Sequence, residues 1–405
     1  MKSLRSLFRI GLGPSSSHTM GPNRAAKEFS ERCPNVDSYR VTLYGSLAAT
    51  GEGHMTDKAI IEVLEPIAPL ELLWEPTVFL PFHPNGMKFE GIKDGKTIDE
   101  WVIYSIGGGE LANEETRKSD ADIYPLTTLH EIMEWCDEAG CNYWEYVEKY
   151  EGPEIWDFLT EVWETMKETI RRGLEHEGVL PGGLGIQRKA CTYMLKAASY
   201  TSSVRSKAKV YAYALATSEE NASGSKVVTA PTCGSCGVLP AVLYHLSQEH
   251  ISSEPRILRA IATAGLFGNI AKENASISGA DVGCQGEVGV ACAMAAAAAC
   301  QLFGGTITQI EYAAEMGLEH HLGLTCDPMC GLVQVPCIER NAIAASRALD
   351  ACTYATLSDG KHKIDYDRIV EVMRETGHDL PSLYKETSTG GIAKIDTKKR
   401  KKSKE

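Results

Sequence analysis

Residues 276–341 read SISGADVGCQGEVGVACAMAAAAACQLFGGTITQIEYAAEMGLEHHLGLTCDPMCGLVQVPCIERN, and the rest of the chain is organised around this stretch. Of the thirteen cysteines in the chain, it carries those at positions 284, 292, 300, 326, 330 and 337. Glycine or proline lies close to Cys284, Cys326 and Cys337, and these residue types interrupt helices and expose backbone N–H groups. A metal cluster ligated by thiolates needs such N–H groups around its sulfur atoms. The surroundings of these three cysteines therefore suit metal ligands.

Two further cysteines, Cys292 and Cys300, lie in an alanine-rich run with strong helix propensity. They are eight residues apart, which places them near one face of a helix. We interpret them as buried thiols that pack between helices.

The composition is that of a globular protein with two domains of ordinary size, at 405 residues, 43% hydrophobic and 23% charged. The net charge of −13 argues against a nucleic-acid partner, because phosphate binding needs a basic surface. Thirteen cysteines, an odd number at irregular spacing, do not suit a secreted disulfide protein and favour a reducing cytoplasm.

The sequence predicts neither a signal peptide nor a membrane span. Arg9 interrupts the apolar patch near the N-terminus, where a signal peptide needs an unbroken apolar core. The alanine-rich run from Val288 to Phe303 is shorter and less apolar than the roughly 20 residues that cross a bilayer. We expect a cytoplasmic protein with no membrane partner.

Residues 1–122 alternate in character and predict an N-terminal α/β domain. Their β-branched and aromatic content predicts strands at Tyr39–Tyr44, Thr77–Leu80 and Trp101–Ile106, and Thr56–Leu64 predicts a short helix. Gly107–Gly109 does not match the dinucleotide-binding fingerprint, so we expect a tight turn from strand to helix there.

Residues 126–393 predict a larger all-helical domain. Apolar residues recur with a period of 3.6 at Leu126–Ala139, Tyr143–Lys149, Ile155–His176 and Ile186–Thr201. The lysine-rich tail at 394–405 predicts a disordered basic end. The fold class that follows is α+β with two domains, of which the second is all-α.

Two motifs in the first domain combine polar side chains with turn residues. In GPSSSHTMGP, residues 13–22, hydroxyl groups and free N–H groups at a helix start form a ready site for a carboxylate. In GEGHMTD, residues 51–57, His54 stands on a glycine loop just before a helix, and histidine is the commonest general base. A third histidine, His83, lies at the edge of a Pro-Asn-Gly turn.

The Cys233-Gly-Ser-Cys236 motif invites a zinc or redox interpretation, which its context does not support. A zinc site needs a second cysteine pair at suitable spacing, and a thioredoxin-like site needs a βαβ setting, whereas this motif lies among helices. We expect its glycines to serve the backbone conformation and do not assign its cysteines as ligands. The pair His320-His321 is likewise interpreted as structural.

The segments SGADVGCQGEVGVACAMAAA, GLTCDPMCGLVQVPCIERNA and GLGPSSSHTMGP together resemble the bacterial iron–sulfur L-serine dehydratases over nearly the whole chain. The resemblance implies a [4Fe–4S] cluster held by Cys284, Cys326 and Cys337, with one iron open to substrate. It implies His54 as the base that removes the α-proton, and a homodimer as the assembly. It also implies a pocket for the substrate carboxylate and further substrate contacts at Ser15, Ser16, Ser17, His18, Thr19 and His83.

The sequence departs from the pattern of that family in three places. Family members commonly end with a cysteine shortly after an ETS-x-GG motif, but here Glu386–Gly391 is followed by a tail without cysteine. Cys330 is a residue that the family pattern generally lacks, so water or Cys330 are the candidates for the open iron at rest. The N-terminal domain is also shorter than usual, which bears on any regulatory serine site in it.

Other functions remain open at this stage. The same fold and cluster could act on L-cysteine or L-threonine, because small changes of substrate alter pocket contacts only modestly. An iron–sulfur sensor or electron carrier needs a fully ligated cluster and no histidine base, which the two histidine motifs oppose. A pyridoxal-phosphate enzyme needs a Schiff-base lysine and a phosphate-binding glycine loop, and the sequence offers no convincing pair.

Overall fold

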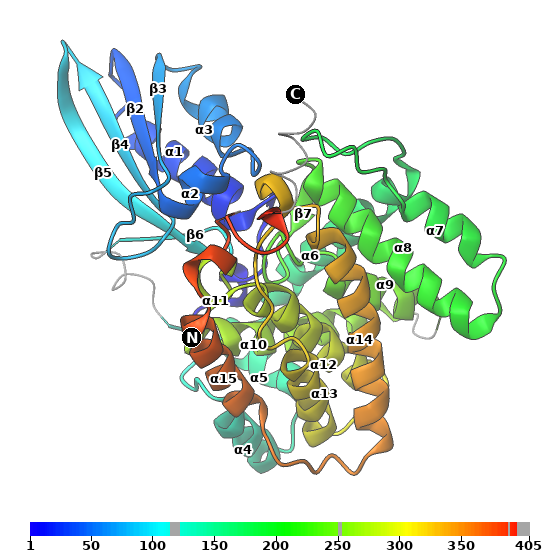
Figure 1. Cartoon of the computed structure of the whole chain (residues 1–405). Helices are drawn as coiled ribbons and strands as arrows, with labels where there is room; N and C mark the ends of the chain where they lie inside the picture. The colour runs from blue at the N-terminus through cyan, green and yellow to red at the C-terminus, as the bar shows by residue number, and fades with distance from the viewer. Residues whose placement is uncertain (114–121, 250–252, 388, 395–405) are drawn as a thin grey trace.

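A computed structural model describes residues 1–113, 122–249, 253–387 and 389–394 (Figure 1). The first domain contains a five-stranded mixed sheet with strand order β3-β2-β4-β5-β6. β2 pairs in parallel with β3 and antiparallel with β4, and the remaining neighbours are antiparallel. The strands are β2 (Ser38–Tyr44), β3 (Leu70–Glu75), β4 (Gly86–Lys93), β5 (Lys96–Gly107) and β6 (Glu110–Ala112).

Helices α1 (Gly21–Arg32) and α3 (Thr56–Leu64) contact each other and bury apolar side chains with the sheet. Alternate residues of β2 point into this small core, as a strand with one covered face requires. Val41 and Leu43 are completely buried there with Phe29 of α1. The short helix α2 (Gly45–Thr50) follows β2 directly and leads to the loop that carries His54.

The second domain is helical and is centred on α12, which contacts α9, α10, α13 and α14 (Figure 1). A helix that is apolar on every side must lie inside a protein, and the alanines of α12 are all completely buried. Its helices are α4 (Leu129–Ala139), α5 (Tyr143–Glu151), α6 (Ile155–Glu175), α7 (Ala190–Ala197), α8 (Ser202–Ala222), α9 (Val238–Glu249), α10 (Glu254–Asn274), α11 (Gly279–Val282), α12 (Val290–Leu302), α13 (Ile307–Glu319), α14 (Cys337–Leu357) and α15 (Tyr366–Asp379).

The two domains are interlaced at the start of the chain. Met1, Leu4, Leu7 and Phe8 are buried in the core of the helical domain. β1 (Ile10–Leu12) then pairs antiparallel with β7 (Lys226–Val228), a short strand between α8 and α9. The chain therefore enters the first domain from the body of the second. The domain boundary near residue 122 stays a prediction, and residues 395–405 of the predicted disordered tail lie outside the described residues.

The predicted α+β class with two domains is confirmed. The predicted helix at Thr56–Leu64 is α3, and the strands predicted at Tyr39–Tyr44 and Trp101–Ile106 fall in β2 and β5. Of the segment predicted as a helix at Ile186–Thr201, only Ala190–Ala197 forms α7. In the described ranges, no helix combines the length and apolarity needed to cross a membrane.

Two sequence predictions in the first domain are wrong. Thr77–Leu80 is not a strand, because Pro76 and Pro81 flank it and the neighbouring segment Leu70–Glu75 pairs with β2 instead. Gly107–Gly109 does not lead into a helix. All three of these glycines have positive φ, and they form the turn by which β5 returns as β6.

Candidate active site

His18 and His54 form a buried, stacked pair within the first domain. Their ring centroids are 4.5 Å apart and their planes are inclined by 28°. His18 belongs to a single π-helical turn, Ser16–Met20, that runs directly into α1, whereas His54 lies in the turn that precedes α3. At most 1% of either residue is exposed.

The backbone fixes the tautomer of His54. Its Nδ1 lies 3.0 Å from the carbonyl oxygen of Thr50, which can only accept a hydrogen bond, so Nδ1 carries the proton. Nε2 is then the basic atom of the neutral ring. Burial lowers the pKa of His54 from 6.5 to about 4, against a smaller opposite effect of the Thr50 carbonyl. The ring is therefore neutral at pH 7, with its lone pair on Nε2.

His18 is held by two serines in the opposite tautomer. Ser46 Oγ donates to the carbonyl of Glu386 at 2.8 Å, so it accepts from His18 Nε2, which lies 3.2 Å away. Ser17 Oγ lies 2.9 Å from the other ring nitrogen, Nδ1, and is placed to donate to it. Burial, reinforced by the nearby His54, lowers the pKa of His18 well below its usual range.

Glu386 joins the histidine pair from the far end of the chain. Its Oε1 lies 3.5 Å from His18 Nδ1 and 3.5 Å from His54 Nε2. Burial, with the charge of Glu287 nearby, raises the pKa of Glu386 well above its usual range. The three ligand atoms lie within 4.8 Å of one another, a spacing that a metal ion could use. Ser17 already occupies His18 Nδ1, which leaves His54 Nε2 and Glu386 Oε1 as the two atoms of the trio that are placed to exchange a proton.

Cys284, Cys326 and Cys337 come together in the helical domain from three separate segments. Cys284 precedes the π-helical turn Gln285–Gly289 that leads into α12, and Cys337 is the first residue of α14. Cys326 lies between them in the sequence, in a loop whose backbone forms a parallel β-bridge with Lys385. Burial raises the pKa of all three thiols, and the charges of Cys284 and Cys337 add to the effect on Cys326. Cys284 and Cys326 are buried and Cys337 is partly exposed, and the effect of the three thiols on one another's pKa places their sulfur atoms close together.

A guanidinium group faces these three thiols. Arg340 lies one turn into α14, and although burial lowers its pKa, the charges of the three cysteines raise it above the usual value. Its Nη1 donates to the carbonyl of Thr325 at 2.6 Å, which fixes the side chain beside Cys326. The positive charge and the N-terminus of α14 both favour thiolate over thiol.

Glu386 and Glu287 connect the histidines to the cysteines. The backbone N–H of Glu386 donates to the Cys326 carbonyl at 2.6 Å. Glu287 Oε2 lies 3.8 Å from the sulfur of Cys326, and Thr232 Oγ1 donates to Glu287 Oε1 at 2.7 Å. The structure thus brings His18, His54 and the three cysteines into one site made by both domains.

The predicted carboxylate-binding residues are buried beside this site, and several support it. Ser15 caps the π-helical turn by accepting from the His18 N–H at 3.0 Å. Thr19 Oγ1 donates to the His54 carbonyl at 2.6 Å. Ser16 is 3% exposed. His83 is half-buried and close enough to His18 to lower its pKa, and burial lowers its own pKa to about 4.

Three residues of the site were not predicted from the sequence: Glu386, Arg340 and Glu287. Each had a weak signal. Glu386 opens the ETS-x-GG motif, Arg340 follows Cys337 by three residues, and Glu287 stands in the glycine-rich run after Cys284. Acidic and basic residues are rarely buried unless they are paired, but burial is not visible in a sequence.

Other cysteines of the motifs have apolar surroundings. Cys292 and Cys300 are completely buried in α12, as predicted, and Cys292 donates to the Ala344 carbonyl at 3.4 Å. Cys233 and Cys236 form a small apolar cluster with Val227 and Met20. In their loop, Asn341 of α14 receives the Gly237 N–H at 2.9 Å and donates to the Gly234 carbonyl at 2.7 Å. These hydrogen bonds to the backbone of Gly234 and Gly237 are consistent with the expectation that the glycines of the motif serve the backbone conformation.

Comparison with known proteins places the chain in a family. The model of the serine dehydratase alpha chain matches residues 104–393, and that of the beta chain matches residues 3–74. The chain belongs to the bacterial single-chain L-serine dehydratase family.

Individual relatives are similar to the chain over almost its full length. The L-serine dehydratase of Streptomyces coelicolor is 40% identical, over 96% of this chain and 98% of the relative. L-serine dehydratase 1 of Escherichia coli is also 40% identical, over 97% and 99%. The L-serine dehydratase of Helicobacter pylori is 35% identical, over 97% and 98%.

Proposed function

We propose that this protein is an L-serine ammonia-lyase, a lyase that removes water and ammonia from L-serine and leaves pyruvate. The observation that carries the proposal is His54 Nε2, a neutral basic atom that Glu386 connects to three clustered thiols. An elimination of water needs a base for the α-proton and an acid for the departing hydroxyl group, and this site offers a place for each. The names of the relatives support serine as the substrate.

We propose a [4Fe–4S] cluster at Cys284, Cys326 and Cys337. The donor set fits, because the three thiols lie together, two of them buried and Cys337 partly exposed, and the nearby guanidinium of Arg340 favours their thiolate forms. Glycines also let the backbone come close. A Cβ at Gly279 would lie 3.0 Å from the sulfur of Cys326. When bound, such a cluster supplies a Lewis acid for the hydroxyl group of the substrate.

His54 is the proposed base. Nε2 accepts the α-proton, the electron pair of the Cα–H bond forms the Cα–Cβ double bond, and the bond from Cβ to oxygen breaks. The hydroxyl oxygen keeps the electron pair of that bond, takes up a proton and leaves as water. The enamine that results tautomerises and hydrolyses to pyruvate and ammonia. The Thr50 carbonyl accepts from Nδ1 throughout and stabilises the imidazolium that forms.

The residues around His18 are the proposed binding site for the substrate carboxylate. The first N–H groups of a helical turn have no acceptor within the turn, and Ser15, Ser16, Ser17 and Thr19 surround the start of the turn Ser16–Met20. His18 and His83 complete this side of the site. A cytoplasmic location and a homodimer stay predictions.

The test is pyruvate formation from L-serine by protein reconstituted anaerobically with iron and sulfide. We expect turnover that is lost when the same sample is exposed to air, because a cluster with an open iron is sensitive to oxygen. L-threonine and L-cysteine assayed alongside would show which β-substituted amino acid is preferred. Activity that survives air and chelation would contradict the cluster. A fully loaded cluster with no turnover of any of the three amino acids would favour the sensor instead.

A further inference from the structure

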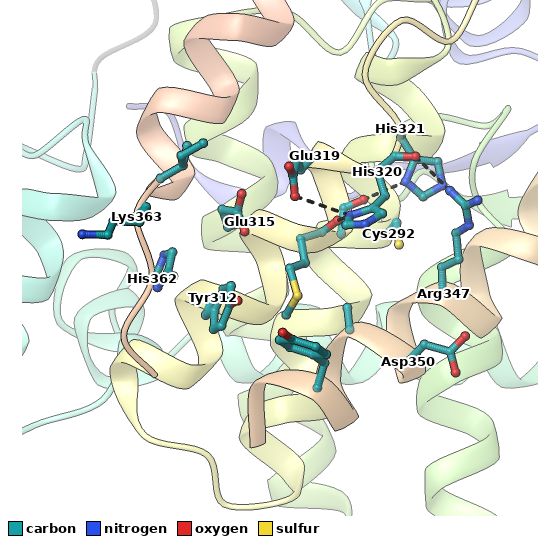
Figure 2. A pocket seen from close by; sticks show the side chains of 15 residues that line it. Cys292, Tyr312, Glu315, Glu319, His320, His321, Arg347, Asp350, His362 and Lys363 are labelled. Carbon is teal, nitrogen blue, oxygen red and sulfur yellow. Dashed lines mark hydrogen bonds and ion pairs between the residues drawn. The ribbon is translucent and has the colours of Figure 1, made fainter. Parts of the chain in front are cut away.

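A pocket of about 710 Å³ opens on the helical domain between α13, α14 and the segment that precedes α15 (Figure 2). Cationic, acidic and aromatic side chains line it together. Arg347 and Lys363 are exposed, and Arg347 Nη1 donates to the carbonyl of His320 at 2.8 Å. The volume lies within the roughly 300–1,000 Å³ of typical small-molecule sites.

Glu315 of α13 is the unusual member of this lining. Only 3% of the residue is exposed, and the described residues give its carboxyl no hydrogen bond and no ion pair. Figure 2 shows it within the pocket lining, between Glu319 and Tyr312. The little surface that Glu315 exposes includes its carboxyl oxygens, which open to the pocket. A carboxyl so nearly withdrawn from water and without a protein partner is costly to ionise, and a ligand at the pocket could supply the missing partner.

The surroundings of Glu315 are acidic. Burial raises its pKa to about 8, and the carboxylates of Glu319, Glu311 and Asp365 add to the effect. All three neighbours disfavour a second negative charge. A bound positive charge would pair with the carboxylate of Glu315 and would also offset the repulsion from the three neighbouring carboxylates.

A neighbouring acid shows the contrast. Glu311 lies one turn earlier on α13 and is equally buried, but it accepts from the Tyr366 N–H at 2.7 Å and pairs with His362 Nε2 at 2.8 Å. The ring of His362 is stacked on Tyr312, with centroids 4.2 Å apart. The fold therefore satisfies Glu311 with its own groups and leaves Glu315 to face the pocket.

We propose that this pocket binds an organic ammonium group, with Glu315 as its counter-ion. Tyr354 is an exposed ring of the lining, set edge-to-face against Tyr312 with centroids 6.1 Å apart, and it supplies an aromatic face that attracts a cation. A bare metal ion fits less well. Among the described residues, a spacing suited to metal ligands occurs at His18, His54 and Glu386 but not here. The ammonium group could belong to an amino acid or to a polyamine. The proposal does not depend on the proposed dehydratase activity.

The test is isothermal titration calorimetry with benzylammonium as the probe and benzyl alcohol as its uncharged counterpart. We expect the wild-type protein to bind benzylammonium and not benzyl alcohol. Glu315→Gln should weaken binding by about tenfold or more, and Glu319→Gln, which changes an exposed acid at the same pocket, by less than about threefold. No binding at millimolar probe, equal binding of the alcohol, or unchanged binding by Glu315→Gln would overturn the proposal.

A second readout does not depend on how well the variant folds. Because its pKa is about 8, most of Glu315 is protonated at pH 7, and binding of a cation must release that proton. Titrations of the wild-type protein in two buffers of different ionisation enthalpy should show release of close to one proton, and release of none would count against Glu315. Displacement of the probe by L-serine identifies an amino acid as the source, and displacement by putrescine alone identifies a polyamine. Either result supports the site.

Discussion

The ring of His54 lies against the ring of His18, and Glu386 Oε1 lies 3.5 Å from a nitrogen of each. Two imidazolium ions could not stack in this way without strong repulsion, so at most one of the rings carries a charge at a time. Both rings are buried and neutral at pH 7, which leaves His54 Nε2 free to accept a proton. In the proposed mechanism His18 serves the carboxylate side of the site, where Ser17 and Ser46 hold its ring from either side.

Replacement of His54 by glutamine should lower kcat for pyruvate formation by about 10²–10⁴-fold, the usual contribution of a general base. The cluster content of the variant should match that of the wild type. The same variant should also lose exchange of the α-proton of L-serine with deuterium in D₂O, measured by NMR. His130→Gln is the matched control, because His130 is an exposed histidine far along the chain on α4. Retained α-proton exchange in His54→Gln would assign the base to another residue.

Alanine at Cys284, Cys326 or Cys337 should each prevent assembly of a complete cluster. We expect iron and sulfide bound after anaerobic reconstitution to fall to a small fraction of the wild-type content. Cys292→Ala, Cys233→Ala and Cys236→Ala are controls of equal chemistry, since these thiols are at least as buried but pack among apolar side chains. Loss of iron from the Cys233 and Cys236 variants, with retention in the first three, would move the cluster to the Cys-x-x-Cys motif.

Cys330 tests what occupies the open iron at rest. Cys330 lies in the turn Met329–Gly331 with φ of 55°, and a Cβ at Gly53 would lie 2.7 Å from its carbonyl oxygen. The backbone of the turn is thus held against the loop that carries His54. We expect water at the open iron, so that Cys330→Ala leaves the Mössbauer and absorption spectra of the resting enzyme unchanged. Altered spectra in this variant would identify Cys330 as the resting ligand.

The sequence predicts those helices and strands that are determined by the residues within the segment itself. The helix Thr56–Leu64 was predicted from its Thr-Asp start, and the strand at Tyr39–Tyr44 from its β-branched and aromatic content. Thr77–Leu80 failed because strand pairing depends on partners elsewhere in the chain, and Leu70–Glu75 takes the place beside β2. A strand propensity between two prolines was outweighed by that pairing.

The candidate site divides in the same way. The histidines and cysteines stand in glycine-rich or proline-rich motifs that mark them in the sequence. Glu386 carries such a motif too, but its role depends on lying beside His18 and His54, more than three hundred residues earlier. The role of Arg340 depends on its position beside three thiols that come from separate segments of the chain. Tertiary proximity of this kind has no local signal, so these two residues could not be assigned before the structure.

His321 should make the protein less stable in acid. Burial lowers its pKa from 6.5 to about 4, while its Nδ1 donates to the Gly317 carbonyl at 2.7 Å. Between these two pH values the unfolded chain binds a proton at this position and the folded chain does not. The free energy of unfolding therefore falls as pH drops from 6.5 to 4. The pKa shift corresponds to a loss of about 3 kcal/mol in the free energy of unfolding over that pH window. Below pH 4 this loss does not grow further.

His321→Asn isolates this effect, because the asparagine amide can still donate to the Gly317 carbonyl but does not titrate. In urea unfolding at a series of pH values, the stability of the variant relative to the wild type should rise by about 3 kcal/mol between pH 7 and pH 4. Other buried groups, such as Glu315 and His54, titrate in both proteins and cancel from the difference. His130→Asn, at an exposed position, should show no such rise. A difference between His321→Asn and wild type that stays constant across the series would mean that His321 is protonated alike in the folded and unfolded chain.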